Sequence, residues 1–218
     1  MIELLFSNPI AFFRLLVLLI PGFLVGVTVH EFAHGWVADR LGDPTARRQG
    51  RLTLNPLPHI DPIGAIAIFI AGFGWAKPVP VNAFNLRHPH RDMALVAAAG
   101  PVSNFIAAFA ALIVFHFARH LAGIPFFYEP IAGMLEAIYS INVGLGVFNL
   151  IPLPPLDGGH FLPYFLPRGA RWQLVNQIEQ MGPIILILLI VSGATGFIMR
   201  PAMGFVFWVL ETLVRLIF

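Results

Sequence analysis

The residues HEFAH, at positions 30–34, lie near the end of an apolar segment that begins at Ile10. On a helix, residues i and i+4 share one face, so the imidazoles of His30 and His34 can bind one metal ion. The carboxylate of Glu31 then lies where it can take a proton from metal-bound water. Because the flanking residues are strongly apolar, the sequence predicts a hydrolytic metal site within a membrane.

A second interpretation of the same residues stays open at this point. The two histidines could make interhelical hydrogen bonds, and the glutamate could lie at a helix end. Ionisable groups at membrane depth are costly and usually mark function, which favours the metal site. The chain has no cysteine, so any zinc must be bound by histidine and carboxylate, a ligand set typical of catalytic sites.

Composition indicates a membrane protein. Hydrophobic residues make up 58% of the 218 residues and charged residues 11%, whereas soluble domains carry about 25% charged residues. Residues 1–9 contain Glu3 and no cation, so the first apolar segment is expected to be a retained span rather than a cleaved signal. Five segments approach the roughly 20 residues needed to span: 10–38, 93–118, 131–153, 183–199 and 202–218.

The last two segments are separated by Arg200-Pro201, which predicts a tight helical hairpin whose turn lies at these two residues. A sixth apolar piece, 63–75, contains three glycines and is too short to cross easily, so it is expected to be re-entrant or buried, with a full span left open. We therefore expect an all-α polytopic membrane protein with about five to six transmembrane helices and a re-entrant or short β-like segment. Residues 1–218 are expected to form a single integral-membrane domain.

The cations predict the orientation. Seven of the 13 Lys and Arg residues lie between Arg40 and Arg91, and such clusters mark cytoplasmic loops. His30 precedes Arg40 by ten residues, or about 15 Å of helix. The metal is thus expected within the bilayer of the cell membrane, nearer its cytoplasmic side.

Residues 77–82 contain two prolines, which confine them to a sheet edge or to an extended run outside a sheet. An open edge near a catalytic site could pair with an extended substrate. An ordinary loop explains the same residues.

The stretch NLIPLPPLDGGH, at positions 149–160, supplies a third ligand candidate. Its prolines break a helix and its glycine pair permits a sharp turn. Unwound backbone at membrane depth is tolerated only where it is buried in protein or lines a wet cavity, and the charge of Asp157 would need a cation there. Alone, Asp157 could be a helix-terminal residue at the interface, but with His30 and His34 it completes an open tetrahedral zinc site.

Together these motifs resemble the site-2 protease family of intramembrane zinc metalloproteases, peptidase family M50. The match consists of HExxH in a transmembrane segment and N-x-x-P-x-x-P-x-D-G-G over a hundred residues later. Residues 34–45, 55–62 and 99–104 are similar to the short prokaryotic branch. The resemblance extends over about residues 20–165. Many relatives carry a PDZ or CBS domain, for which 218 residues leave no room.

The resemblance implies one zinc ion per chain, bound by His30, His34 and Asp157, with Glu31 as the catalytic base. It also implies that Asn149 orients the substrate or stabilises the oxyanion. For an asparagine among prolines, a structural role in capping the broken helix is an equal alternative.

Other polar residues have weaker signals. Asn104 could line the cavity and contact substrate, or make a helix-packing contact. His59 and Asp61 could line or gate the site, or belong to a turn built by Asn55-Pro56 and Asp61-Pro62. The remaining histidines are expected at the membrane interface: His88, His90, His116 and His120.

The expected function is hydrolysis of peptide bonds in or near transmembrane segments, with a membrane-spanning protein as substrate and the lipid bilayer as surroundings. A substrate helix must unwind locally first, and residues 77–82 are a candidate receiver for the extended strand. No nucleic-acid partner is expected. The alternatives are a metal transporter, which would more often show inverted repeats and several ligand sets, and a catalytically inactive substrate-binding relative.

Overall fold

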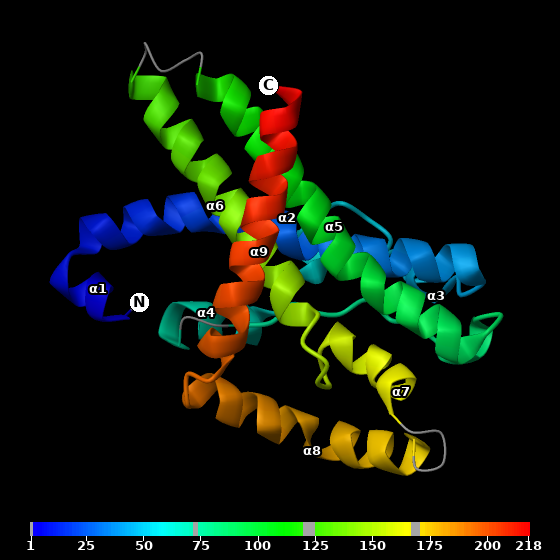
Figure 1. The fold of residues 1–218 in the computed structure, drawn as a ribbon. Coiled ribbons are helices and arrows are strands. Elements are labelled where there is room, and N and C mark those ends of the chain that lie inside the picture. Colours follow the sequence, from blue (N-terminus) through cyan, green and yellow to red (C-terminus); the bar gives the residue numbers. More distant parts are fainter. Residues whose placement is uncertain (1, 72–73, 120–124, 167–170) are drawn as a thin grey trace.

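The computed structural model describes residues 2–71, 74–119, 125–166 and 171–218, which are helical almost throughout (Figure 1). Among them there is no strand, only an antiparallel bridge between Ile60 and Ala76. Five helices are long and apolar enough to cross a membrane, with candidate spans in α6 and α8 starting at Tyr128 and Gln173. They are α2 (Pro9–Leu41), α5 (Pro89–Ala118), α6 (Pro125–Asn149), α8 (Arg171–Val191) and α9 (Thr195–Ile217). The chain is thus an all-α multi-pass membrane protein, as the sequence predicts.

Shorter elements of the described residues lie before and between these spans. The α-helices are α1 (Ile2–Ser7), α3 (Thr45–Arg48), α4 (Pro62–Ala71) and α7 (Leu162–Phe165). The 3-10 helices are η1 (Leu57–His59), η2 (Ala83–Asn85) and η4 (Asp157–Phe161).

Helices α2, α5 and α6 form the centre of the molecule, with α2 lying across the other two (Figure 1). Gly22 and Gly26 lie one turn apart on α2 and face α6. A Cβ on Gly22 would lie 3.0 Å from the carbonyl oxygen of Ala137, and one on Gly26 would lie 2.6 Å from Leu145 Cδ1. Small residues at this spacing let two membrane helices approach closely, so the glycines bring α6 next to the histidine-bearing helix.

The apolar segment expected at 63–75 begins with α4, whose ten residues span about 15 Å. A Cβ on Gly64 would overlap the carbonyl oxygen of Trp75, so the chain returns to the start of α4. This helix is too short to be one of the candidate spans. Residues 72–73 of the segment lie outside the described residues.

The C-terminal hairpin turns at a different place from the one predicted. Helix α8 ends at Val191, Gly193 follows with φ +73°, and Pro201 lies inside α9. The predicted break at Arg200-Pro201 is therefore wrong. Glycine adopts the left-handed conformation that ends a helix, whereas a proline within a membrane helix removes one hydrogen bond and is tolerated.

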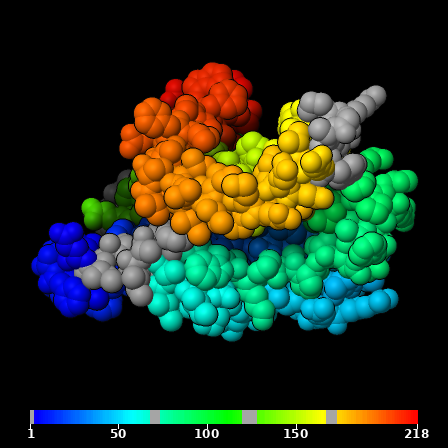
Figure 2. Space-filling view, turned by 90° about the horizontal axis from the view of Figure 1, so that it is seen from below, coloured from blue at the N-terminus to red at the C-terminus, as the bar shows by residue number. Residues whose placement is uncertain are grey.

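Helix α8 packs against the loop that follows α6. Ile151, Leu153 and Leu156 of that loop form a cluster with Ile178 and Ile185 of α8. A Cβ on Gly182 would overlap the carbonyl oxygen of Pro154, so the helix lies directly on the loop backbone. In Figure 2, α8 lies across the middle of the face shown, and α2 is visible at the bottom of a hollow between α8 and the segment that carries α4. The hairpin therefore supports the loop that carries Asp157.

Candidate metal centre

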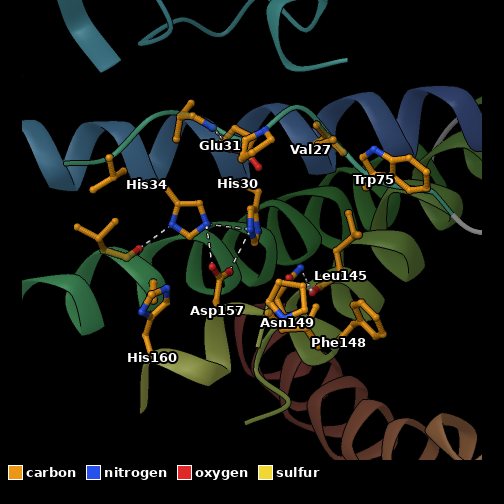
Figure 3. Close-up of a pocket in the computed structure, with 18 of the residues that line it drawn as sticks. Val27, His30, Glu31, His34, Trp75, Leu145, Phe148, Asn149, Asp157 and His160 are labelled. Carbon is orange, nitrogen blue, oxygen red and sulfur yellow. Dashed lines mark hydrogen bonds and ion pairs between the residues drawn. The ribbon is translucent and has the colours of Figure 1, made fainter. Parts of the chain in front are cut away.

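Three ionisable side chains meet in the centre of the molecule (Figure 3). His30 and His34 come from α2, and Asp157 is the first residue of η4. The two Nε2 atoms are 2.9 Å apart, and they lie 3.1 Å and 3.3 Å from the carboxylate oxygens of Asp157. In a tetrahedral site with ligands at about 2.1 Å, the ligand atoms are about 3.4 Å apart. The spacing is therefore close to that of a zinc site.

The loop between α6 and η4 brings Asp157 to the histidines. Its prolines stop α6 at Asn149, because they cannot donate helical hydrogen bonds. A Cβ on Gly158 would overlap the carbonyl oxygen of Ile151, and one on Gly159 would lie 2.9 Å from the nitrogen of Pro154. Both glycines lie within η4, where the lack of a side chain lets the preceding loop pack directly on their backbone.

Hydrogen bonds fix which nitrogen of each imidazole carries the proton. His34 Nδ1 lies 2.7 Å from the carbonyl oxygen of Val96, which can only accept, so this nitrogen donates. His30 Nδ1 donates to Asn104 Oδ1 at 2.7 Å. Asn104 presents its oxygen because its amide nitrogen donates to the carbonyl of Gly26 at 2.9 Å. In the neutral rings both Nε2 atoms therefore carry lone pairs.

These lone pairs face the carboxylate of Asp157, whose Oδ2 is buried without a hydrogen-bond donor among the described residues. Three groups that can only accept thus meet in one place, an arrangement that a cation stabilises. Two imidazoles and one carboxylate are a ligand set that zinc uses in catalytic sites, and a carbonyl or amide behind each ligating imidazole is the usual support. The residues present fit zinc.

Helix α5 passes very close to both histidines. A Cβ on Gly100 would lie 2.5 Å from His34 Nε2 and 2.6 Å from His30 Cε1. Only glycine leaves room for both rings at this position.

Glu31 lies beside the metal centre and is 7% exposed. Its Oε2 accepts a hydrogen bond from the backbone nitrogen of Val79 at 2.7 Å. Residues 77–82 lie in no helix or strand, which fits the loop that the sequence offered as an alternative to a sheet edge. The segment borders a cavity of about 590 Å³ that is lined mostly by apolar residues and contains Glu31 and the three candidate ligands.

The two asparagines of interest occupy different places. Asn149 lines the cavity, and its amide nitrogen donates to the carbonyl of Leu145 at 3.0 Å, so it also caps its own helix. Asn104 is fully buried and is not among the described residues that line the cavity. The sequence offered a position lining the cavity as one possibility for Asn104. The structure instead places its amide behind His30, between α2 and α6.

His59 and Asp61 lie in the turn that the sequence offered as an alternative. His59 is fully buried, and its Nε2 donates to the carbonyl of Thr53 at 2.9 Å. Asp61 Oδ1 accepts from the backbone nitrogens of Ile63 and Gly64 at the start of α4. Neither residue is among the described ones that line the cavity.

The other histidines lie at helix ends. The backbone nitrogen of His88 donates to Asp92 at the start of α5, and the carbonyl of His90 accepts from Tyr164. The ring of His116 stacks on Phe218 with centroids 4.4 Å apart. His120 lies outside the described residues.

Two residues near the site were not singled out from the sequence. His160 lines the cavity next to the candidate ligands (Figure 3). Asn142 is fully buried and donates to and accepts from its neighbours behind the site. A signal for Asn142 exists in the sequence, since it lies two helical turns before Asn149 in an apolar helix.

Comparison with known proteins settles the family. The model of peptidase family M50 matches residues 127–192, which include the loop with Asp157. YwhC of Bacillus subtilis, named as a zinc metalloprotease, is 40% identical over 183 residues, 83% of either chain. The chain belongs to peptidase family M50. Another relative, Rip2 of Mycobacterium tuberculosis strain H37Rv, also named as a zinc metalloprotease, is 30% identical over 94% of this chain and 77% of its own.

This M50 protein is thus a zinc metalloprotease of the site-2 protease family. Membership of this protease family removes the transporter alternative. The multi-pass fold agrees with membership of the family. No solved structure gives a significant match to the chain.

Proposed function

We propose that this metalloprotease cleaves peptide bonds in or near the transmembrane segments of other proteins of the cell membrane. The observation that carries the proposal is the position of the site: both histidines and the glutamate belong to a candidate span, and the cavity beside them is mostly apolar. A polypeptide segment that leaves the lipid can occupy such a cavity without losing apolar contacts. A site of this kind suits an apolar substrate segment better than the polar surface of a soluble protein.

In the proposed arrangement His30, His34 and Asp157 hold one zinc ion. Zinc bound there would polarise the scissile carbonyl and lower the pKa of water to about 7. Val96 and Asn104 keep the protons of the two imidazoles on Nδ1, so that both Nε2 lone pairs point to the same place. His30 and His34 are buried and Asp157 is partly buried, so the proposed ligands are largely shielded from bulk water.

Glu31 is the proposed general base. It takes a proton from the attacking water and passes it to the leaving amine. The bond from Val79 holds one carboxylate oxygen, so the other oxygen is left for this transfer. Asn149 borders the same cavity, and we propose that the free end of its amide orients the substrate or stabilises the oxyanion.

A substrate helix hides its backbone, so cleavage requires local unwinding. Glycine and proline lower the cost of unwinding by about 1 to 3 kcal/mol per residue. We therefore expect a single-span model substrate with Gly or Pro near the scissile bond to be cleaved faster than one in which these residues are replaced by Leu.

The test compares wild type, Glu31→Gln and Glu211→Gln in liposomes that contain either substrate, with a folded soluble protein as a third substrate. Glu211 lies on α9 and pairs with Arg215, so its variant is a matched control with wild-type activity. Glu31→Gln should keep its zinc and lose cleavage. Two results together would contradict the proposal: efficient cleavage of the folded soluble protein, and equal cleavage rates for the two membrane substrates despite their different helix stabilities.

A further inference from the structure

Behind His30 lies a chain of two buried asparagine side chains. Asn104 of α5 and Asn142 of α6 are both fully buried. Asn104 Nδ2 donates to Asn142 Oδ1 at 3.0 Å, and Asn142 Nδ2 donates to the carbonyl of Ile138 at 2.8 Å. Buried amides in an apolar bundle are costly unless they are hydrogen-bonded, and here both amides are engaged at their two ends.

The direction of every bond in this chain is fixed by backbone carbonyls. The carbonyls of Ile138 and Gly26 can only accept, so each must face an amide nitrogen. Asn142 consequently presents its oxygen to Asn104. Both amide hydrogens of Asn104 are then used, one on Gly26 and one on Asn142, and its oxygen is left for His30.

The orientation of Asn104 decides whether His30 can bind a metal. If the amide turned over, its nitrogen would face His30 Nδ1, and that atom would have to accept. The imidazole proton would then move to Nε2 and remove the lone pair from the ligand position. Turning Asn104 over would also bring oxygen against oxygen at two places, Gly26 and Asn142, and Asn142 supplies the second of these barriers.

We propose that Asn142 is a positioning residue for the metal site, which acts through Asn104 to hold the metal-binding tautomer of His30. The inference rests on the proposed zinc site and extends it to a residue that contacts neither metal nor substrate. His34 has a different support, because its Nδ1 bonds directly to the backbone of Val96. The dependence on a side-chain relay is therefore specific to His30.

The first readout is zinc affinity, measured on purified full-length protein by competition with a chromophoric chelator. Removal of a group that supports a metal ligand costs about 10- to 100-fold in affinity. We expect Asn104→Leu to fall in this range and Asn142→Leu to lose about tenfold. Because the ligands stay in place, the cleavage activity of Asn142→Leu should return when zinc is saturating. Asn142→Ala removes the same amide without added bulk and should behave alike if the Leu variant does not fold.

The second readout is additivity. If Asn142 acts through Asn104, the double variant should bind zinc no more weakly than Asn104→Leu alone, whereas independent effects would add. The absorption spectrum of bound Co²⁺ should change more in Asn104→Leu than in Asn142→Leu. Tyr139→Phe is the matched control, since this α6 residue carries a buried hydroxyl outside the relay, and its zinc affinity should equal that of wild type.

Two outcomes overturn the relay: wild-type zinc affinity in folded Asn142→Leu or Asn142→Ala, and full additivity with Asn104→Leu. Failure of the proposed function gives a different result. A wild-type protein that bound neither zinc nor Co²⁺ would overturn the metal site together with the relay. A wild-type protein that bound zinc but did not cleave membrane spans would leave the relay supported and overturn only the substrate class.

Discussion

The two halves of the candidate metal site are supported in different ways. His30 and His34 lie on α2, a regular helix of 33 residues whose geometry alone places the two rings on one face. Asp157 lies after an irregular loop that depends on prolines, on Gly158 and Gly159, and on α8 packed behind it. The helical half needs room for its rings, whereas the loop half needs a second helix, distant in sequence, to hold it in position.

Filling the space beside the helical half should have the largest effect. Gly100→Ala would place a Cβ within 2.6 Å of both imidazoles, and neither ring can move without leaving the proposed ligand position. We expect zinc affinity to fall by at least about 10- to 100-fold, the loss seen when a ligand's support is removed, and cleavage to fall with it.

Gly144→Ala is the matched control for this change. A Cβ there meets only Met203 Cε at 3.7 Å, an ordinary contact. Zinc affinity by chelator competition should remain at the wild-type value in the control. Equal affinities in the Gly100 and Gly144 variants would show that the rings are not held against α5.

Displacing the support of the loop half should have a smaller effect. Gly182→Ala forces α8 away from the backbone of Pro154, while the histidine pair keeps its place. We expect a loss of zinc affinity below that of Gly100→Ala, with a lower thermal midpoint for the apo protein. Gly196→Ala, where a Cβ meets no described atom within 4 Å, is the control. A Gly182 variant with unchanged affinity and midpoint would remove the hairpin from the explanation.

The same contrast explains what could be predicted from the sequence. The spacing of His30 and His34 is local, and the prolines before Asp157 end a helix wherever they occur, so both parts of the site were accessible. The sequence predicts the turn of the hairpin at Arg200-Pro201, but a proline can lie inside a membrane helix, and the helix ends instead near Gly193 with its left-handed backbone. The relay through Asn142 could not be derived, since it depends on how α2, α5 and α6 approach one another.

The smallest expected effect concerns the far end of α2. Asp43 is fully buried and accepts from Thr45, from Asn82 at 2.6 Å and from Asn85 at 2.8 Å, which ties the turn after α2 to the end of residues 77–82 and to η2. Burial acts to raise the pKa of Asp43, but these hydrogen bonds outweigh burial and lower it. The ionised form is therefore stabilised by folding.

A group with a lowered pKa contributes stability above its unfolded pKa, about 3.9, and loses it as pH falls through the folded value. Asp43→Asn should lower the free energy of unfolding by on the order of 1–3 kcal/mol at neutral pH. The difference in stability between variant and wild type should shrink below about pH 4, where Asp43 becomes protonated. The thermal unfolding midpoints of both proteins, measured across pH 3–7, report this difference in stability. A difference that is constant with pH would contradict the role of the charge.

The most direct measurement is the zinc content of purified wild type, His34→Ala, Asp157→Ala and His116→Ala, by metal analysis after dialysis against buffer without metal. His116 stacks on Phe218 away from the candidate ligands, so its variant controls for the loss of a histidine. We predict one zinc ion per chain in wild type and in His116→Ala, and far less than one in the other two, because the helix and the loop must both contribute. Stoichiometric zinc in both His34→Ala and Asp157→Ala would contradict the assignment of the site.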